Sequence, residues 1–263
     1  MATITAADVK KLRDATGAGM MDAKKALVEA EGDAQRAARI LREKGLTKVA
    51  TLEDRENNQG AVAIARDGNT AALVELKSET DFSAKSEDFV ATVKKLAEAV
   101  LADGLGAIET LAEDIDTLKI SKKENIVVGK VERFEAADGN VLDTYLHEQD
   151  GRGTVGVLLE LAGADAELAH EISLHIAFAK PTGLSRDEID PALVATAREG
   201  FEELTRKEGK PDQAIPKIVE GRVNSWFAER ILPEQGMFGD KETVQDRLGA
   251  GSVVRFALAV IGH

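Results

Sequence analysis

Few segments of this chain combine reactive and binding side chains, and the most unusual is 79–83, Glu-Thr-Asp-Phe-Ser. A predicted strand ends there, and a predicted helix starts near Ser86. In one interpretation Phe82 completes the core, while Asp81 or Ser83 caps the following helix. In the other, Phe82 is an exposed aromatic beside a carboxylate on a connecting loop, where binding residues concentrate.

A second unusual group is the pair Met20 and Met21 in a predicted helix. Neighbouring helical residues point about 100° apart, so the two side chains cannot both face one core. An exposed Met beside Arg13 and Lys24 suits a partner surface, because Met repacks easily. A partly buried surface Met is the alternative, and the sequence leaves both open.

Patterns of known catalytic and nucleotide sites do not fit this chain. The segment 17–19, Gly-Ala-Gly, follows a predicted helix instead of a strand and lacks the third glycine of a dinucleotide fingerprint. His170 and His175 point about 140° apart on a helix, so they cannot share a metal from one face; we expect one at the surface and one at a helix–sheet contact. There is no Walker A sequence and no Gly-x-Ser-x-Gly elbow. Asp81 and His147 would form an acid–base pair only if the fold brought them together.

Composition bounds the class of protein. The chain has 263 residues, of which 43% are hydrophobic and 31% charged, which is globular and long enough for about two domains. It has no Cys, which excludes disulfides, Cys-based zinc sites and thiol catalysis. The net charge of −13 disfavours direct nucleic-acid binding and anionic membranes. Without an apolar run of about 18 residues or a signal peptide, we expect a cytoplasmic chain.

The N-terminal part of the chain is basic relative to the rest. The first 54 residues carry ten Lys or Arg and nine Asp or Glu, a balance of +1 against −14 for the rest. Three short helices are expected there, with a capping box at Thr5, an N-cap at Asp33 and a stop at Gly45. Residues 46–58 are polar and aperiodic, which is typical of a linker. So small a core needs support from a partner.

The middle of the chain contains a weak repeat. A predicted β-hairpin around residues 67–69 precedes a helix over 86–101, and a second hairpin around 150–152 precedes a helix over 164–179. Such a unit buries its sheet face under its own helix, so two copies predict two related α+β subdomains. Between them, residues 102–124 are expected to form a loop and one short acidic helix. Further strands are expected at 126–134, 141–146, 154–161 and 253–261.

Helical period returns over residues 190–231. Two apolar lines are separated by a turn at 208–211, and Pro216 fits the first turn of the second helix. This pattern predicts an antiparallel helical hairpin inserted before the final strand.

The chain carries three motifs, at residues 12–27, at 79–85, and at 209–211 with 218–222. They resemble signatures of the bacterial elongation factor Ts family. Residues 12–27, Leu-Arg-Asp-Ala-Thr-Gly-Ala-Gly-Met-Met-Asp-Ala-Lys-Lys-Ala-Leu, resemble its N-terminal signature. Residues 79–85, Glu-Thr-Asp-Phe-Ser-Ala-Lys, resemble the second, and 209–211 with 218–222 resemble the third. The motifs follow in the family's order and spacing across nearly the whole chain.

The resemblance implies an α+β fold. A UBA-like three-helix module would precede a core of two related sheet-plus-helix subdomains, with an antiparallel helical hairpin inserted. The expected boundaries are 1–54 for the module and linker, 55–140 for core subdomain N, and 141–263 for core subdomain C with hairpin 190–231.

The family is the guanine-nucleotide exchange factor of elongation factor Tu. The resemblance implies binding of elongation factor Tu in its GDP-bound and nucleotide-free states, and release of GDP by disturbing the magnesium and phosphate site, with no bond chemistry and no cofactor. By resemblance, the exchange residues are Thr80, Asp81, Phe82 and Ser83. The partner-binding residues are Arg13, Met20, Met21, Lys24 and His147.

The chain departs from the family pattern at a few positions. Ser83 replaces the usual Val, which predicts looser packing behind Phe82. Lys122 and Lys123 replace an Ile-Gly pair. The sequence ends at His263, so we expect no further C-terminal helix.

Two alternatives stay open. A non-exchanging adaptor would bind elongation factor Tu without changing nucleotide dissociation. A scaffold protein would rest on the helical hairpin, which is also the surface considered for a homodimer.

Overall fold

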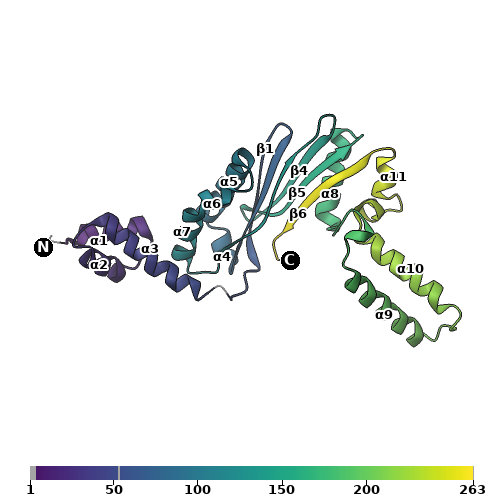
Figure 1. Ribbon diagram of the computed structural model, residues 1–263, viewed down its shortest axis with the longest axis horizontal. Coiled ribbons are helices and arrows are strands. Elements are labelled where there is room, and N and C mark those ends of the chain that lie inside the picture. The colour runs from purple at the N-terminus through teal and green to yellow at the C-terminus, as the bar shows by residue number, and fades with distance from the viewer. Residues whose placement is uncertain (1–3, 53, 263) are drawn as a thin grey trace.

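The computed structural model describes residues 4–52 and 54–262, and of residues 46–50 only the backbone; His263 and the expectation attached to it lie outside the described residues. The molecule is elongated (Figure 1). Three N-terminal helices lie at one end, the strands and their covering helices form the middle, and a pair of helices projects at the other end. Mixed helix and antiparallel sheet confirm the α+β class.

The N-terminal helices are α1 (Ala6–Thr16), α2 (Met20–Glu29) and α3 (Ala34–Ala50). The Thr5 capping box is present, and Asp33 accepts hydrogen bonds from the first turn of α3. Their shared core is small and aliphatic, and it includes Val9, Leu12, Leu27 and Leu41.

The predicted helix stop at Gly45 is wrong, because α3 continues to Ala50 and shortens the expected linker. Gly45 packs instead against α7 (Ala112–Lys122): a Cβ there would lie 2.9 Å from the Ile120 side chain. The missing side chain lets the two helices approach closely. This packing, and not chain termination, accounts for the glycine.

Two three-stranded antiparallel sheets form the middle of the molecule. In the first, β2 (Thr70–Ser78) lies between β1 (Gln59–Asp67) and β3 (Val127–Glu135). In the second, β5 (Arg152–Ala162) lies between β4 (Val141–Gln149) and β6 (Ser252–Val260). A single pairing, Val62 with Gly153, joins them into one six-stranded sheet.

The repeat predicted from sequence recurs in the topology. Each half is a β-hairpin, then a helix, then a third strand that pairs with the second strand of the hairpin. Helix α5 (Glu87–Asp103) covers the first sheet, and α8 (Ala166–Ala179) covers the second. The predicted final strand is confirmed as β6.

A third apolar cluster lies between the two halves and includes Val62, Leu73 and Leu158. Gly156 of β5 belongs to this contact, because a Cβ there would lie 2.6 Å from Cγ1 of Val62. The close approach of the two halves therefore depends on a residue without a side chain.

The remaining helices connect these parts. Residues 102–124 hold two helices, α6 (Ala107–Thr110) and α7, where one was expected. Helices α9 (Pro191–Lys207) and α10 (Ile215–Ala228) pack together, with Pro216 in the first turn of α10. The segment before β6 contains α11 (Val244–Leu248) and short 3-10 turns at Leu232–Glu234 and Met237–Gly239. Among the described residues, no helix has the length and apolar character needed to cross a membrane.

Candidate functional site

The segment that follows β2 is a single helical turn, α4 (Asp81–Ala84), and not an open loop. Thr80 caps it, and its side-chain oxygen accepts a hydrogen bond from the backbone N–H of Ser83 at 3.2 Å. The turn leaves Phe82 84% exposed, so the interpretation of Phe82 as a core residue is wrong. Among the described residues, Phe82 has the largest exposed fraction of any large hydrophobic side chain.

Glu124, between α7 and β3, anchors this turn. Its Oε2 accepts hydrogen bonds from the backbone N–H groups of Glu79 and Thr80, each at 3.2 Å. Its Oε1 accepts from the hydroxyls of Thr80 at 2.7 Å and Ser83 at 2.5 Å. Sequence reasoning missed Glu124, because its partners lie more than forty residues away and no local pattern marks it.

The positions that depart from the family pattern have definite roles. Ser83 is buried and uses its hydroxyl on Glu124, so this position contributes a polar anchor. Lys122 pairs with Asp88 of α5 at 2.7 Å. Lys123 ends α7 with φ +56°, a left-handed conformation that favours glycine.

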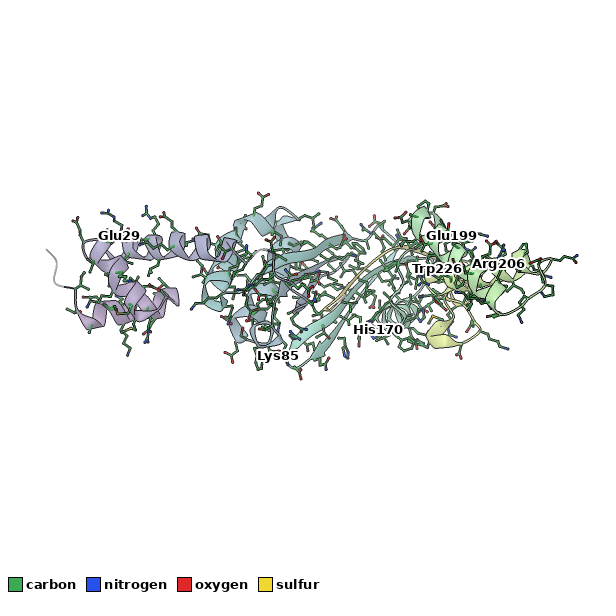
Figure 2. The ribbon with its side chains drawn as sticks, turned by 90° about the horizontal axis from the view of Figure 1, so that it is seen from below. Glu29, Lys85, His170, Glu199, Arg206 and Trp226 are labelled. Carbon is green, nitrogen blue, oxygen red and sulfur yellow. The ribbon has the colours of Figure 1, made fainter. Side chains whose placement is uncertain are left out.

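Asp81 is paired with a lysine that reaches the other half of the molecule. Lys85, labelled in Figure 2, has its Nζ 2.8 Å from Oδ2 of Asp81 and 3.1 Å from Oδ2 of Asp150, in the turn between β4 and β5. The hydrogen bond from Lys85 lowers the pKa of Asp81, and the bonds to Asp81 and Asp150 raise the pKa of Lys85. Asp81 is therefore a carboxylate at neutral pH.

Arg152 lies buried below this ion pair. Its guanidinium donates to the carbonyl oxygen of Gly60 at 2.8 Å and to the side chain of Gln59 at 3.2 Å. Burial lowers the pKa of Arg152, while the charges of Asp81 and Asp150 raise it. The turn between β4 and β5 thus contacts the start of β1 through Arg152 and the end of α4 through Lys85. The predicted partner-binding residue His147 lies on β4 shortly before this turn.

His147 is exposed on β4, and its Nδ1 lies 3.3 Å from the Tyr145 hydroxyl. The Tyr145 ring also meets His170 edge-on, with centroids 6.4 Å apart (His170 is labelled in Figure 2). Asp81 bonds to Lys85 and His147 to Tyr145, so these two residues do not form the acid–base pair that the sequence left open.

The two histidines of α8 are separated, as their spacing predicts. His170 is exposed, while His175 is buried with its Nε2 3.1 Å from Gln235 and its Nδ1 accepting from the backbone N–H of Phe238. His175 thus hydrogen-bonds to the segment before α11. Burial lowers its pKa. Among the described residues, no cluster of three or more His, Asp or Glu side chains could hold a metal ion.

The N-terminal candidates lie on the helices at one end of the molecule, whereas α4, which carries Phe82, lies in its middle part (Figure 1). Met20 and Met21 of α2 are 46% and 65% exposed, so neither is a core residue. Lys24 is exposed on the same helix, and Arg13 of α1 pairs with its neighbour Asp14. The structure therefore brings the predicted residues together in two groups, one on the N-terminal helices and one around α4 and β4.

A cavity of about 810 Å³ lies between these groups, where the N-terminal helices meet α7. Gly17, Leu41, Gly45 and Ile120 are part of its lining. The lining contains neither Asp81 nor His147, the two residues of the possible acid–base pair.

Comparison with known proteins decides the family. Residues 79–263 match the family model described as elongation factor TS. The chain belongs to the elongation factor Ts family. Elongation factor Ts of Deinococcus radiodurans is 41% identical over 97% of this chain and 98% of its own length. Elongation factor Ts of Streptomyces griseus subsp. griseus is 43% identical over the full length of both. Family membership makes the protein a translation elongation factor.

Proposed function

We propose that this chain promotes the release of GDP from elongation factor Tu, so that GTP can rebind. The observation that carries the proposal is Phe82, a large aromatic side chain exposed on an anchored helical turn beside the ionised Asp81. Membership in the elongation factor Ts family supports the same partner. In this role the chain is not an enzyme, since it changes no covalent bond.

The energetic requirement follows from linkage. A protein that binds the nucleotide-free partner more tightly than the GDP-bound partner must weaken GDP binding by the same factor. Each tenfold weakening requires about 1.4 kcal/mol of differential binding. Phe82 supplies part of this energy if its ring is buried only when the nucleotide site is distorted.

The carboxylate of Asp81 acts through its charge. A bound magnesium ion is the largest local charge in a nucleotide site, so an added carboxylate reorients or repels its ligands. Lys85 lowers the pKa of Asp81 and pairs with its carboxylate. Thr80 and Ser83 hold the turn from which both side chains project.

The N-terminal helices form the second contact. We assign Arg13, Met20, Met21 and Lys24 to docking on a helix of the GTPase domain, with His147 supporting the contact from β4. Substitution of Arg13 or Met20 by Ala is expected to weaken association and leave the fold intact, because these side chains lie at the surface. Unchanged affinity in both variants would remove this role from the N-terminal helices.

The proposed organisation follows the sequence boundaries. Residues 1–54 form a UBA-like module with its linker, 55–140 and 141–263 form two related core subdomains, and 190–231 form a helical hairpin inserted in the second. A partner that acts in translation implies a cytoplasmic location.

A homodimer through the helical hairpin is the second candidate interaction. Leu193 and Leu204 of α9 are both about half exposed, and Thr205 is the one buried residue among the described residues of this helix. Sedimentation of the chain at several concentrations tests this contact, and a monomer at all of them would refute it.

Stopped-flow release of a fluorescent GDP analogue from elongation factor Tu tests the main proposal. We expect the chain to accelerate release, and the double variant Asp81→Ala/Phe82→Ala to bind without this effect. A stable complex of the parent chain with no acceleration would instead establish a non-exchanging adaptor.

A further inference from the structure

We infer that Glu124 is a positioning residue for the exposed tip formed by Asp81 and Phe82. Its role rests on the proposed exchange function. Glu124 acts through Thr80 and Ser83, which are its bonding partners on either side of the tip. It therefore sets where the ring and the carboxylate project, while its own carboxylate is taken up by bonds to residues 79–83.

The hydrogen bonds of Glu124 are concentrated on one short segment. A carboxylate offers about four acceptor positions, and here four donors from residues 79–83 use them. Two of these donors are backbone N–H groups at the entry to α4, where helical hydrogen bonding leaves N–H groups unpaired. The other two are the hydroxyls of Thr80 and Ser83. One side chain thus fixes both the start of the turn and its inner face.

A turn of this length needs an external anchor. Helix nucleation is unfavourable, and α4 has only four residues. Phe82 adds little packing energy to the fold, because its ring is 84% exposed. The direction of the ring is therefore fixed by the backbone of α4, which Glu124 holds.

The anchor is reciprocal. The backbone N–H of Glu79 donates to Glu124, while the Glu79 carboxylate accepts from the backbone N–H of Asn125 at 2.7 Å. The end of β2 and the start of β3 are thereby clasped together. At the other end of the tip, Lys85 joins Asp81 to Asp150. A tip ordered before binding loses less conformational entropy when it docks, which favours the complex.

Substitution Glu124→Gln tests this role at nearly constant volume. The amide nitrogen of Gln would face two donors, so two of the four hydrogen bonds are lost. Ser83→Ala, which removes one bond, provides a milder variant. Glu109→Gln is the matched control, because Glu109 is exposed on α6 of the same half.

The first readout needs no partner. The chain has one Trp, so Trp226→Phe combined with Phe82→Trp places a single Trp at the tip. Time-resolved fluorescence anisotropy is expected to show larger and faster local motion at position 82 with Glu124→Gln, a smaller change with Ser83→Ala, and none with Glu109→Gln. Unchanged motion at the tip in Glu124→Gln would overturn the inference.

The second readout uses the native Phe82 chain and GDP release. The Glu124→Gln variant loses charge-assisted hydrogen bonds. Its maximal acceleration of GDP release is therefore expected to be roughly tenfold lower than that of the parent chain. The concentration for half-maximal effect is expected to change by less than about twofold, because the N-terminal helices are untouched. A loosened tip with an unchanged maximal rate would also overturn the inference. If the parent chain gave no acceleration, the proposed function would fail, while the anisotropy would still decide whether Glu124 orders the tip.

Discussion

Replacing Phe82 and Phe89 by Ala separates a functional aromatic from a structural one. The two residues differ by seven positions and undergo the same chemical change. Phe89 is fully buried under the first sheet, whereas Phe82 is 84% exposed. Deleting a buried Phe side chain costs about 3–5 kcal/mol of unfolding free energy, while a change at an exposed site stays within about 0.5 kcal/mol.

Phe82→Ala is expected to slow exchange strongly, because the exposed ring is free to be buried by the partner. If the partner buries the ring, the lost contact is worth about 1.5–3 kcal/mol. At about 1.4 kcal/mol for each factor of ten, maximal GDP release should fall by roughly 10-fold to 150-fold. Phe89→Ala should reduce exchange only as far as it unfolds the chain.

Urea unfolding and stopped-flow GDP release measured on the same preparations provide the assay. The expected result is a stable Phe82→Ala chain with slow release and a destabilised Phe89→Ala chain. Marked loss of unfolding free energy in Phe82→Ala would show that the ring supports the fold. A stable Phe82→Ala chain with full exchange activity would refute the role of the ring as the exchange group.

Three further predictions concern stability. Lys123→Gly should raise the unfolding free energy by roughly 0.5–1 kcal/mol, because φ is +56°; a decrease in urea unfolding would contradict this. Gly156→Ala should lower the unfolding free energy by about 1–3 kcal/mol, since the new Cβ would lie 2.6 Å from Val62. Gly221→Ala is the control: this position lies within helix α10 with open space around it, so the change should be neutral or stabilising by up to about 1 kcal/mol. Thermal unfolding of the two variants checks the sign. The pKa of His175 is lowered in the folded state, so the unfolded state takes up the proton first as the pH falls. The unfolding free energy that this residue contributes above pH 6.5 is therefore lost as the pH falls below 6.5. His175→Gln should weaken this acid dependence, and an identical pH profile would contradict the assignment.

Features that depend on neighbours along the chain could be predicted from the residue pattern. The capping box at Thr5, the N-cap at Asp33 and the two β-hairpins follow from residue types a few positions apart. The repeated order of hairpin, helix and strand was visible for the same reason. The two adjacent methionines predicted that at least one is exposed, because one helix face cannot hold both, and the structure exposes both.

Which side chains pack between elements and which stay exposed depended on long-range contacts. Gly45 carries a stop signal, yet α3 continues past it, because a partner helix packs against the missing side chain. Phe82 suited either the core or the surface until the turn of α4 directed it outward.

The same limit explains why Glu124 and the Lys85–Asp150 pair were not foreseen. The hydrogen bond from Ser83 to Glu124 spans 41 residues, and the pair joins the two halves of the molecule. Such contacts arise when strands pair and sheets pack, and these steps bring together residues whose local sequences carry no mark of one another. Local sequence thus determined which elements form and which residues are unusual, and long-range packing decided which side chains hold the exposed tip in place.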